Sequence, residues 1–200
     1  MANCCCNTIY FYSKNKELLE QLMSTIQDDN SYREMFRKNG YTDKKIERSY
    51  IDGRDYITYC TQEISQFDNQ YYFFSIDSET AWAPHMEIFE LLIHEKYNNE
   101  IYFKYLSEEP GMEIFISNDE DKTFFDFKYY VYCDSKTVDE STQYFASKEE
   151  LIDYIAKCFD IEVSILDDIT DMQQLIEEKL QEDEPNCCFR IVKYVIDFRT

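Results

Sequence analysis

The sequence predicts a mixed α+β fold in which helices cover one face of a largely antiparallel sheet. Three observations lead to this prediction. Short runs rich in β-branched and aromatic residues alternate with apolar stripes of helical period. Consecutive strands are separated by turn sequences short enough for hairpins. Of the 200 residues, 44% are hydrophobic and 17% are aromatic, which is too many for a disordered chain and enough for a packed core.

The chain begins with one strand followed by one helix. Residues 8–12 are β-branched and aromatic, as expected of a strand. Leu18, Leu22 and Ile26 then lie four residues apart, which places them on one face of a helix. Ser13 is the expected N-cap of that helix, because a serine hydroxyl can accept a bond from a free amide of the first turn.

A polar insert separates this helix from a pair of strands. Residues 28–55 carry mixed charge, and we expect a short helix over 32–38 within them. The strands are predicted at 56–64 and 71–77, with a turn at 66–69, where Asp and Asn favour chain reversal.

A second helix and a hairpin follow. Pro84 is predicted to begin the helix, because the first turn tolerates its missing N–H, and Asn98 and Asn99 follow its end. Strands are expected at 101–107 and 112–117. Pro110 and Gly111 suit the central positions of a type II turn between them.

The remaining third is predicted to add a strand, two helices and a last strand. Aromatic residues occupy both faces of the strand at 123–133. We expect both faces to be covered, the second by the C-terminal helices; the alternative is an exposed aromatic face that favours association with another protein. Capping boxes at Ser147–Glu150 and Thr170–Gln173 mark the starts of the helices. Residues 189–198 form the last strand.

Through residue 133 this order contains the βαββαβ pattern of a ferredoxin-like sheet. We therefore predict a ferredoxin-like domain over 1–134, with the insert at about 28–55. Residues 135–200 are predicted to form a helical and strand extension packed on that domain.

Charge excludes several classes of function. The formal net charge is -21, from 41 acidic and 20 basic residues. Residues 1–55 are neutral, 56–135 carry -12 and 136–200 carry -9. Direct binding to nucleic acid or to anionic lipid is not expected, because both need clusters of Lys and Arg. The expected partner is a basic host protein, such as a nucleic-acid-binding protein or a nuclease.

The sequence also indicates a cytoplasmic protein. It holds no apolar run of about 20 residues and no signal-peptide pattern at its start. The eight cysteines are therefore expected to be reduced.

Three segments resemble the YubB ferredoxin-like family, which plasmids and phages carry. MANCCCN at residues 1–7 is similar to the family's MANWCxN opening, with Cys4 in place of Trp. ETAWAP at 79–84 is similar to ETAWSPP, with His85 in place of the second Pro, and EEPGM at 108–112 matches a turn of the family. The resemblance covers roughly residues 1–134. It implies a ferredoxin-like fold and a mobile-element setting, without an established activity.

The same segments supply the candidate binding residues. Trp82 and the acidic turn are expected at one end of the sheet and could form a small notch from Glu79, Trp82, His85, Glu108 and Glu109. The alternative is structural, with Trp82 as a core plug and the two turn glutamates solvated.

Residue spacing favours neither a metal site nor an enzyme. Cys4–Cys6 and Cys187–Cys188 lack the CxxC spacing that aims two thiolates at one zinc ion. His85 and His94 fall on opposite sides of one helix, and with 3 Gly the chain cannot build a glycine-rich phosphate loop. We predict no cofactor, no metal and no catalytic residue.

The sequence thus leads to one principal function and two alternatives. The principal prediction is a non-catalytic acidic interaction protein of a mobile element, and its specific form is a nucleic-acid mimic that inhibits a host nucleic-acid-binding or defence protein. The alternatives are a structural or self-assembling module, and a ligand-binding protein or enzyme with a notch near Trp82.

Overall fold

A computed structural model describes residues 4–42, 44–45, 54–135, 142–164, 167–184 and 187–197. The fold is mixed α+β, and the chain divides into two compact units. Unit 1 comprises residues 1–124 and 196–200, and unit 2 comprises residues 125–195. The division falls before the boundary expected at residue 134, and the last residues of the chain belong to unit 1.

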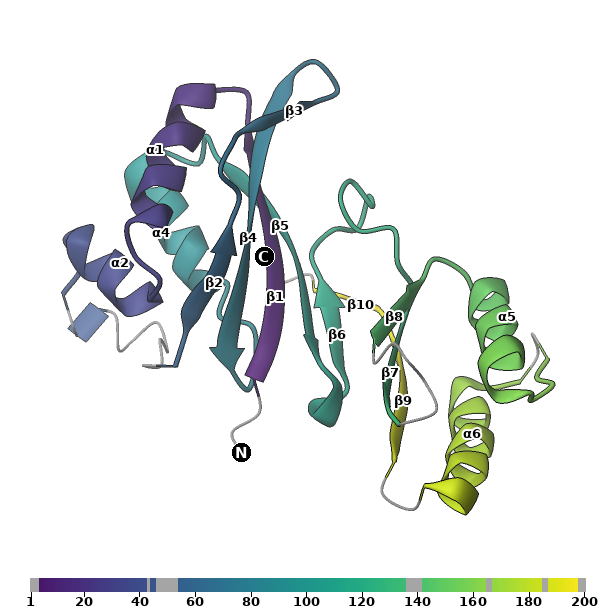
Figure 1. The fold of residues 1–200 in the computed structure, drawn as a ribbon. Helices are drawn as coiled ribbons and strands as arrows, with labels where there is room; N and C mark the ends of the chain where they lie inside the picture. The colour runs from purple at the N-terminus through teal and green to yellow at the C-terminus, as the bar shows by residue number, and fades with distance from the viewer. Residues whose placement is uncertain are drawn as a thin grey trace. The chain divides into compact units, whose positions relative to one another are not determined.

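Unit 1 is built on a sheet with β1 (Cys4–Ser13) at its centre (Figure 1). β1 pairs antiparallel with β4 (Tyr71–Ala81) on one side and with β5 (Tyr102–Glu109) on the other. The order across the sheet is β10-β6-β5-β1-β4-β2, and β3 also pairs with β4. The remaining strands are β2 (Tyr56–Cys60), β3 (Ser65–Phe67), β6 (Ile114–Ser117) and β10 (Val195–Ile196).

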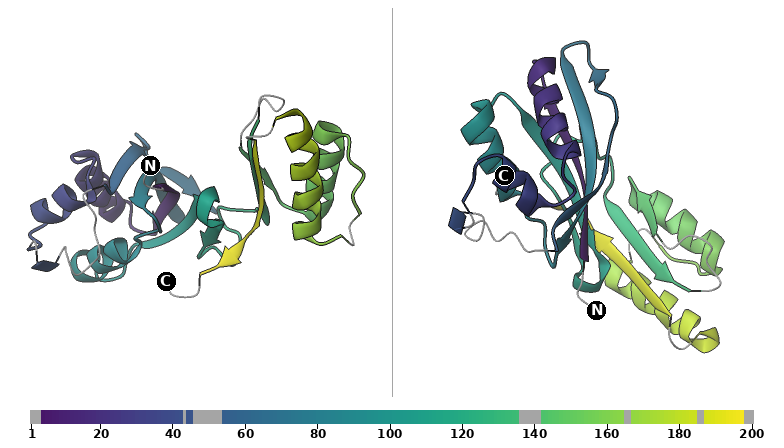
Figure 2. Two further views of the ribbon diagram at one scale, coloured as in Figure 1. Left: turned by 90° about the horizontal axis from the view of Figure 1, so that it is seen from below. Right: turned by 60° about the vertical axis from the view of Figure 1, so that its left-hand side comes forward.

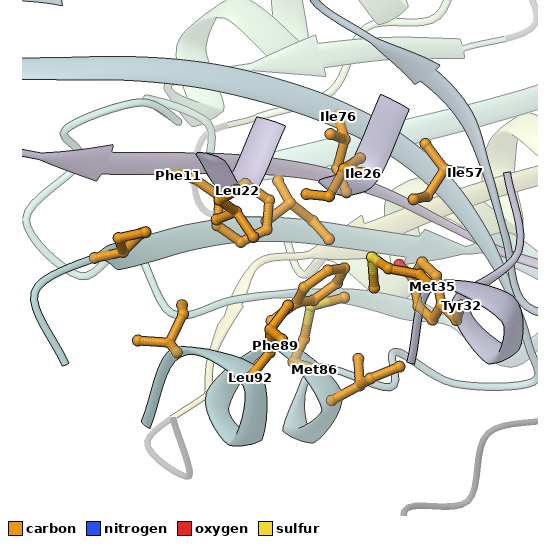
Figure 3. Packing of buried hydrophobic residues seen from close by; sticks show 14 of the residues in the cluster. Phe11, Leu22, Ile26, Tyr32, Met35, Ile57, Ile76, Met86, Phe89 and Leu92 are labelled. Atoms are coloured by element: carbon orange, nitrogen blue, oxygen red, sulfur yellow. The ribbon is translucent and has the colours of Figure 1, made fainter. Parts of the chain in front are cut away.

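Three helices lie on one face of this sheet (Figure 1). They are α1 (Lys16–Gln27), α2 (Tyr32–Lys38) and α4 (Glu87–Tyr97). α2 has the bounds expected from the sequence. The main core fills the space between helices and sheet, and Phe11, Leu22 and Phe89 lie fully buried in it (Figure 3).

The helix-free face of the same sheet carries a second group of rings, which we call the aromatic cluster. Phe124 lies in its middle and stacks on Tyr10, with ring centroids 4.4 Å apart. The buried Asp119 carboxylate holds the Phe124 segment in place, because it accepts hydrogen bonds from the amides of Thr123 and Phe124. The cluster consists of Tyr10, Tyr12, Phe67, Tyr71, Phe73, Tyr102 and Phe124.

Unit 2 is a three-stranded antiparallel sheet with two helices on one face (Figure 2). β7 (Tyr129–Asp134) lies between β8 (Thr142–Phe145) and β9 (Cys188–Lys193). The helices are α5 (Lys148–Phe159) and α6 (Ile169–Asp183). Their buried residues pack with β7 and β9 in a core of their own.

Several element boundaries differ from the prediction, each for a local reason. Asn15 caps α1 in place of Ser13, because the Asn15 side chain accepts from the first amides of α1, while the Ser13 hydroxyl donates to the Glu100 carbonyl. Asp168 caps α6 in place of Thr170. Pro84 precedes the helix that it was expected to begin, since α4 starts at Glu87.

The turns differ as well. A short 3-10 helix, Pro110–Met112, replaces the type II turn, and the positive φ falls on Glu113. The expected strand at 56–64 ends at Cys60, and part of the expected turn at 66–69 pairs with β4 as β3. Residues 123–128 are not in a strand: Phe124 joins the aromatic cluster, and β7 begins at Tyr129.

Candidate functional site

The five residues of the predicted notch lie at one end of the unit 1 sheet, but on different faces. Glu79 on β4 and Glu108 on β5 are the two cross-strand neighbours of Cys6 on β1. Since directly paired residues of antiparallel strands point to the same face, these three side chains form one row on the helix-free face. The thiol is flanked by two carboxylates.

This row makes Cys6 a poor nucleophile. Burial, followed by the negative charges of Glu108 and Glu79, raises the pKa of the Cys6 thiol to about 11. A thiolate beside two carboxylates is unfavourable, so the thiol stays protonated at neutral pH.

Trp82 is exposed at the end of β4. Its side chain does not plug the core, because the residue retains 48% of its accessible surface. Its φ of 71° lies in the left-handed region, which is uncommon for a residue with a Cβ. This turn redirects the chain from β4 toward α4, and the Thr80 hydroxyl donates to the Ala83 carbonyl across it.

His85 is held by a buried carboxylate that sequence reasoning missed. The His85 Nδ1 lies 2.8 Å from Oδ2 of Asp55, whose side chain is fully buried. The other oxygen of Asp55 accepts from the amide of Ala81, and its carbonyl accepts from the amide of Tyr32. Asp55 therefore ties the end of the insert to β4 and α2, and His85 completes this joint.

Glu109 points to the helix-covered face, opposite to Glu108. It is 6% exposed, and its Oε1 accepts from the amide of Gly111 at 3.2 Å. Its Oε2 is buried without a hydrogen-bond partner among the described residues. Glu109 therefore lies on the opposite face of the sheet from Glu79 and Glu108, so the three glutamates do not line one notch.

A buried polar network, which the sequence prediction did not include, lies on the helix-covered face at this end. Asn7 is its centre: its Nδ2 donates to the Thr80 hydroxyl at 3.0 Å, and its Oδ1 accepts from the Ser107 hydroxyl at 2.6 Å. Tyr32 donates to the Ser78 hydroxyl at 2.7 Å. These bonds satisfy polar groups that would otherwise be costly to bury, so the network holds β1, β4, β5 and α2 in register.

Cys5 lies beside this network, and its thiol is expected to be unreactive. The residue is fully buried, and this burial is the main cause that raises the pKa of its thiol to about 12. Within the described ranges, no group of three or more His, Cys, Asp or Glu side chains could hold a metal ion. This end of the sheet thus has the properties of a structural joint.

Cys4, Cys5 and Cys6 are expected to differ in their rates of alkylation by iodoacetamide at pH 8. Cys5 should stay unmodified in the folded protein, and Cys6 should react about tenfold more slowly than a small free thiol, because little thiolate is present and its higher nucleophilicity offsets only part of this. Tandem mass spectrometry of the N-terminal peptide measures each site. Equal labelling of all three in folded protein would contradict this expectation.

A second candidate is the solvent side of the unit 2 helix layer. Six exposed carboxylates on α5 and α6 form what we call the acidic helical face: Glu149, Glu150, Asp153, Asp171, Glu178 and Glu182. The exposed basic residues on these helices are Lys157 and Lys179. Unit 2 as a whole holds 17 acidic and 7 basic residues.

The helix layer of unit 1 differs in its charge pattern. There, acidic side chains have close cationic partners, as in Lys16–Glu20 on α1, Arg37–Glu34 on α2 and Lys45–Glu95 beside α4. On α5 and α6, by contrast, the six exposed carboxylates outnumber the two exposed lysines, and the exposed Leu175 lies among the carboxylates of α6.

Fold and surface together define a two-unit α+β protein with a strongly acidic exterior. Among the described residues, no helix is both long and apolar enough to span a membrane. A comparison with known family models gives no match, and neither does a comparison with curated proteins. A comparison with solved structures gives a chain described as a candidate glycine cleavage system transcriptional repressor. It has 7% identity and a TM-score of 0.29, over 95% of this chain and 98% of that one. At that score the match carries no conclusion about function.

Proposed function

We propose that this chain is a non-catalytic acidic interaction protein that binds a basic partner through the acidic helical face. The observation that carries the proposal is the concentration of exposed carboxylates on α5 and α6, with two exposed lysines among them. A field of one sign accelerates encounter with a partner of the opposite sign and disfavours partners of like charge.

A partner that normally binds nucleic acid suits this surface best. Its binding face must carry Lys and Arg clusters for phosphate contact, and carboxylates on a rigid helix layer could occupy the same cations. The resemblance to the YubB family adds the setting of a mobile genetic element, in which inhibition of a host nuclease or defence protein would be useful.

Unit 1 fits a supporting role as a ferredoxin-like module. The strands β5-β1-β4-β2 are neighbours in that order, with one helix after β1 and another after β4. This is the order of a split βαββαβ unit, to which β3, β6, β10 and α2 are additions.

DNA displacement tests the proposed function. A labelled duplex is bound to each of a panel of purified basic DNA-binding proteins and nucleases, and fluorescence anisotropy follows its release by the full chain. At least one protein should release the duplex at low salt, and competition should weaken steeply as salt rises.

Two charge-matched variants locate the surface. Asp153→Asn, Glu178→Gln and Glu182→Gln together should weaken competition about tenfold, since each exposed charge contributes a few tenths of a kcal/mol or more. Glu17→Gln, Glu63→Gln and Glu120→Gln remove the same charge from exposed positions of unit 1 and should leave competition nearly unchanged. The proposal fails if no protein in the panel releases the duplex, or if both variants weaken competition equally.

A further inference from the structure

The outer edge of β5 has a backbone amide to which none of the described residues offers an acceptor. β6 pairs with β5 from Leu106 to Glu109. Beyond the end of β6, the side chain of Asn118 bonds to the backbone of β5 as a paired strand would. Its Oδ1 accepts from the Tyr105 amide at 2.9 Å, and its Nδ2 donates to the Phe103 carbonyl at 3.2 Å. The chain then turns away toward the buried Asp119.

The amide of Phe103 points to this same edge. In a strand, the N–H and C=O of one residue point to the same side, and the Phe103 carbonyl already points toward Asn118. No acceptor in the described part of the chain bonds to the Phe103 N–H. An unpaired strand edge is a site at which an extended segment can add.

A groove of about 680 Å³ lies beside this edge, between β5 and α4. This volume is within the range of ligand sites in proteins. Leu91, Ile93 and Ile101 supply apolar surface, and Glu87 and Glu90 of α4 supply two carboxylates. Lys104 also lines the groove, but Asp121 holds its ammonium at 3.0 Å.

In the described part of the chain, neither glutamate forms an ion pair with a lysine or arginine, and the remaining basic side chain of the groove is His94. Burial, then the charges of Glu87 and Asp197, raise the pKa of Glu90 above its usual value. An anionic ligand is therefore disfavoured here. A lysine or arginine is favoured, because its aliphatic stem can cover the apolar surface while its charged end reaches the carboxylates.

We propose that this groove binds an extended peptide segment of a partner protein, which pairs with the β5 edge at Phe103 and directs a lysine or arginine toward Glu87 and Glu90. The segment would continue the line that β6 leaves at Asn118. Backbone pairing supplies affinity, and the basic side chain supplies selectivity. The inference concerns unit 1 and does not depend on the acidic helical face.

The test uses a phage-displayed library of random linear peptides, selected against the full chain. The recovered peptides should share a Lys or Arg beside β-branched residues. Bound peptide should slow hydrogen exchange at the Phe103 amide, as measured by NMR, because this amide then has an acceptor. Norleucine in place of the basic residue should weaken binding at least tenfold while it retains an apolar stem.

Two double variants complete the test. Glu87→Gln with Glu90→Gln should weaken peptide binding about tenfold, and Glu17→Gln with Glu63→Gln, which removes equal charge elsewhere in unit 1, should not. Circular dichroism confirms that both remain folded. The proposal is overturned if the recovered peptides lack a basic residue, if the Phe103 amide stays unprotected, or if both variants weaken binding equally.

Two further outcomes also overturn it. Failure to recover any peptide is one. The other is a dimer in light scattering whose formation protects the Phe103 amide, because the occupant would then be a second copy of the chain. The DNA-displacement assay tests a surface of unit 2 with its own variants. Either proposal can therefore fail while the other holds.

Discussion

Replacement of Phe11 by alanine is expected to lower the free energy of unfolding of unit 1 by about 4 kcal/mol. Phe11 is fully buried at the centre of the main core (Figure 3). Its ring centroid lies 5.2 Å from that of Phe74 and 5.1 Å from that of Phe89. Truncation removes these contacts and leaves a cavity that three strands and a helix cannot easily close.

Urea denaturation measures the effect, and the single tryptophan, Trp82, reports on unit 1. Phe11→Leu should cost clearly less, because most of the volume is retained. Tyr59→Ala, at a residue that is 53% exposed on β2, is the matched control and should change stability little. A loss below about 1 kcal/mol for Phe11→Ala would show that the ring does not support the core.

Alternation along the chain was sufficient to predict the elements of this core. The odd-numbered residues of β1, such as Ile9 and Phe11, are buried against the helices, and the even-numbered ones are half-buried or exposed. In α1, Leu22 and Ile26 are buried as their spacing predicts, whereas Leu18 is half-buried and its neighbour Leu19 is buried instead. Periodicity succeeds here because burial of one face is a local property of a strand or a helix.

Side-chain partners far apart in the sequence could not be predicted in this way. Asn7 and Asp55 look like solvent-facing residues in the sequence, yet both are almost fully buried. Asn7 bonds to Thr80 and Ser107, which are 73 and 100 residues away. A polar residue is buried when it finds partners, and the partners depend on strand order, which the residue's own neighbours in sequence do not determine.

The boundary between the two units also could not be predicted from the local sequence pattern. Residues 123–128 have the aromatic composition of a strand, and β-propensity alone assigns them to one. The Asp119 carboxylate instead binds the Thr123 and Phe124 amides. Phe124 stacks in the aromatic cluster, and the strand begins only at Tyr129.

Alkaline pH is expected to destabilise unit 1, beginning near pH 9. Several buried or half-buried acids of this unit have a raised pKa: burial raises that of Cys5 to about 12 from 9.0, and those of Tyr12 and Tyr41 to about 12. The folded state then holds these protons more tightly than the unfolded state. Their contribution to stability is complete below the unfolded pKa and is lost as pH rises through the folded pKa.

Cys5 offers the sharpest measure of this effect. Between pH 9 and pH 11 the unfolded thiol ionises while the folded one does not, which costs on the order of 2 kcal/mol for this residue. The free energy of unfolding, from urea denaturation under reducing conditions, should therefore fall over this interval. In Cys5→Ala it should fall less steeply.

Cys158→Ala provides the control, because Cys158 is exposed on α5 in unit 2. Its pH dependence, followed by Trp82 fluorescence and circular dichroism, should match that of the unaltered chain. Cys5→Ala also loses the thiol contact to Asn7 Oδ1 at 3.6 Å, but that loss is present at every pH and shifts the curve without changing its slope. An equal slope in Cys5→Ala and the unaltered chain between pH 9 and 11 would mean that the Cys5 thiol ionises as readily in the folded state as in the unfolded one. Water would then reach the Cys5 side chain, and this end of the core would not be fully buried.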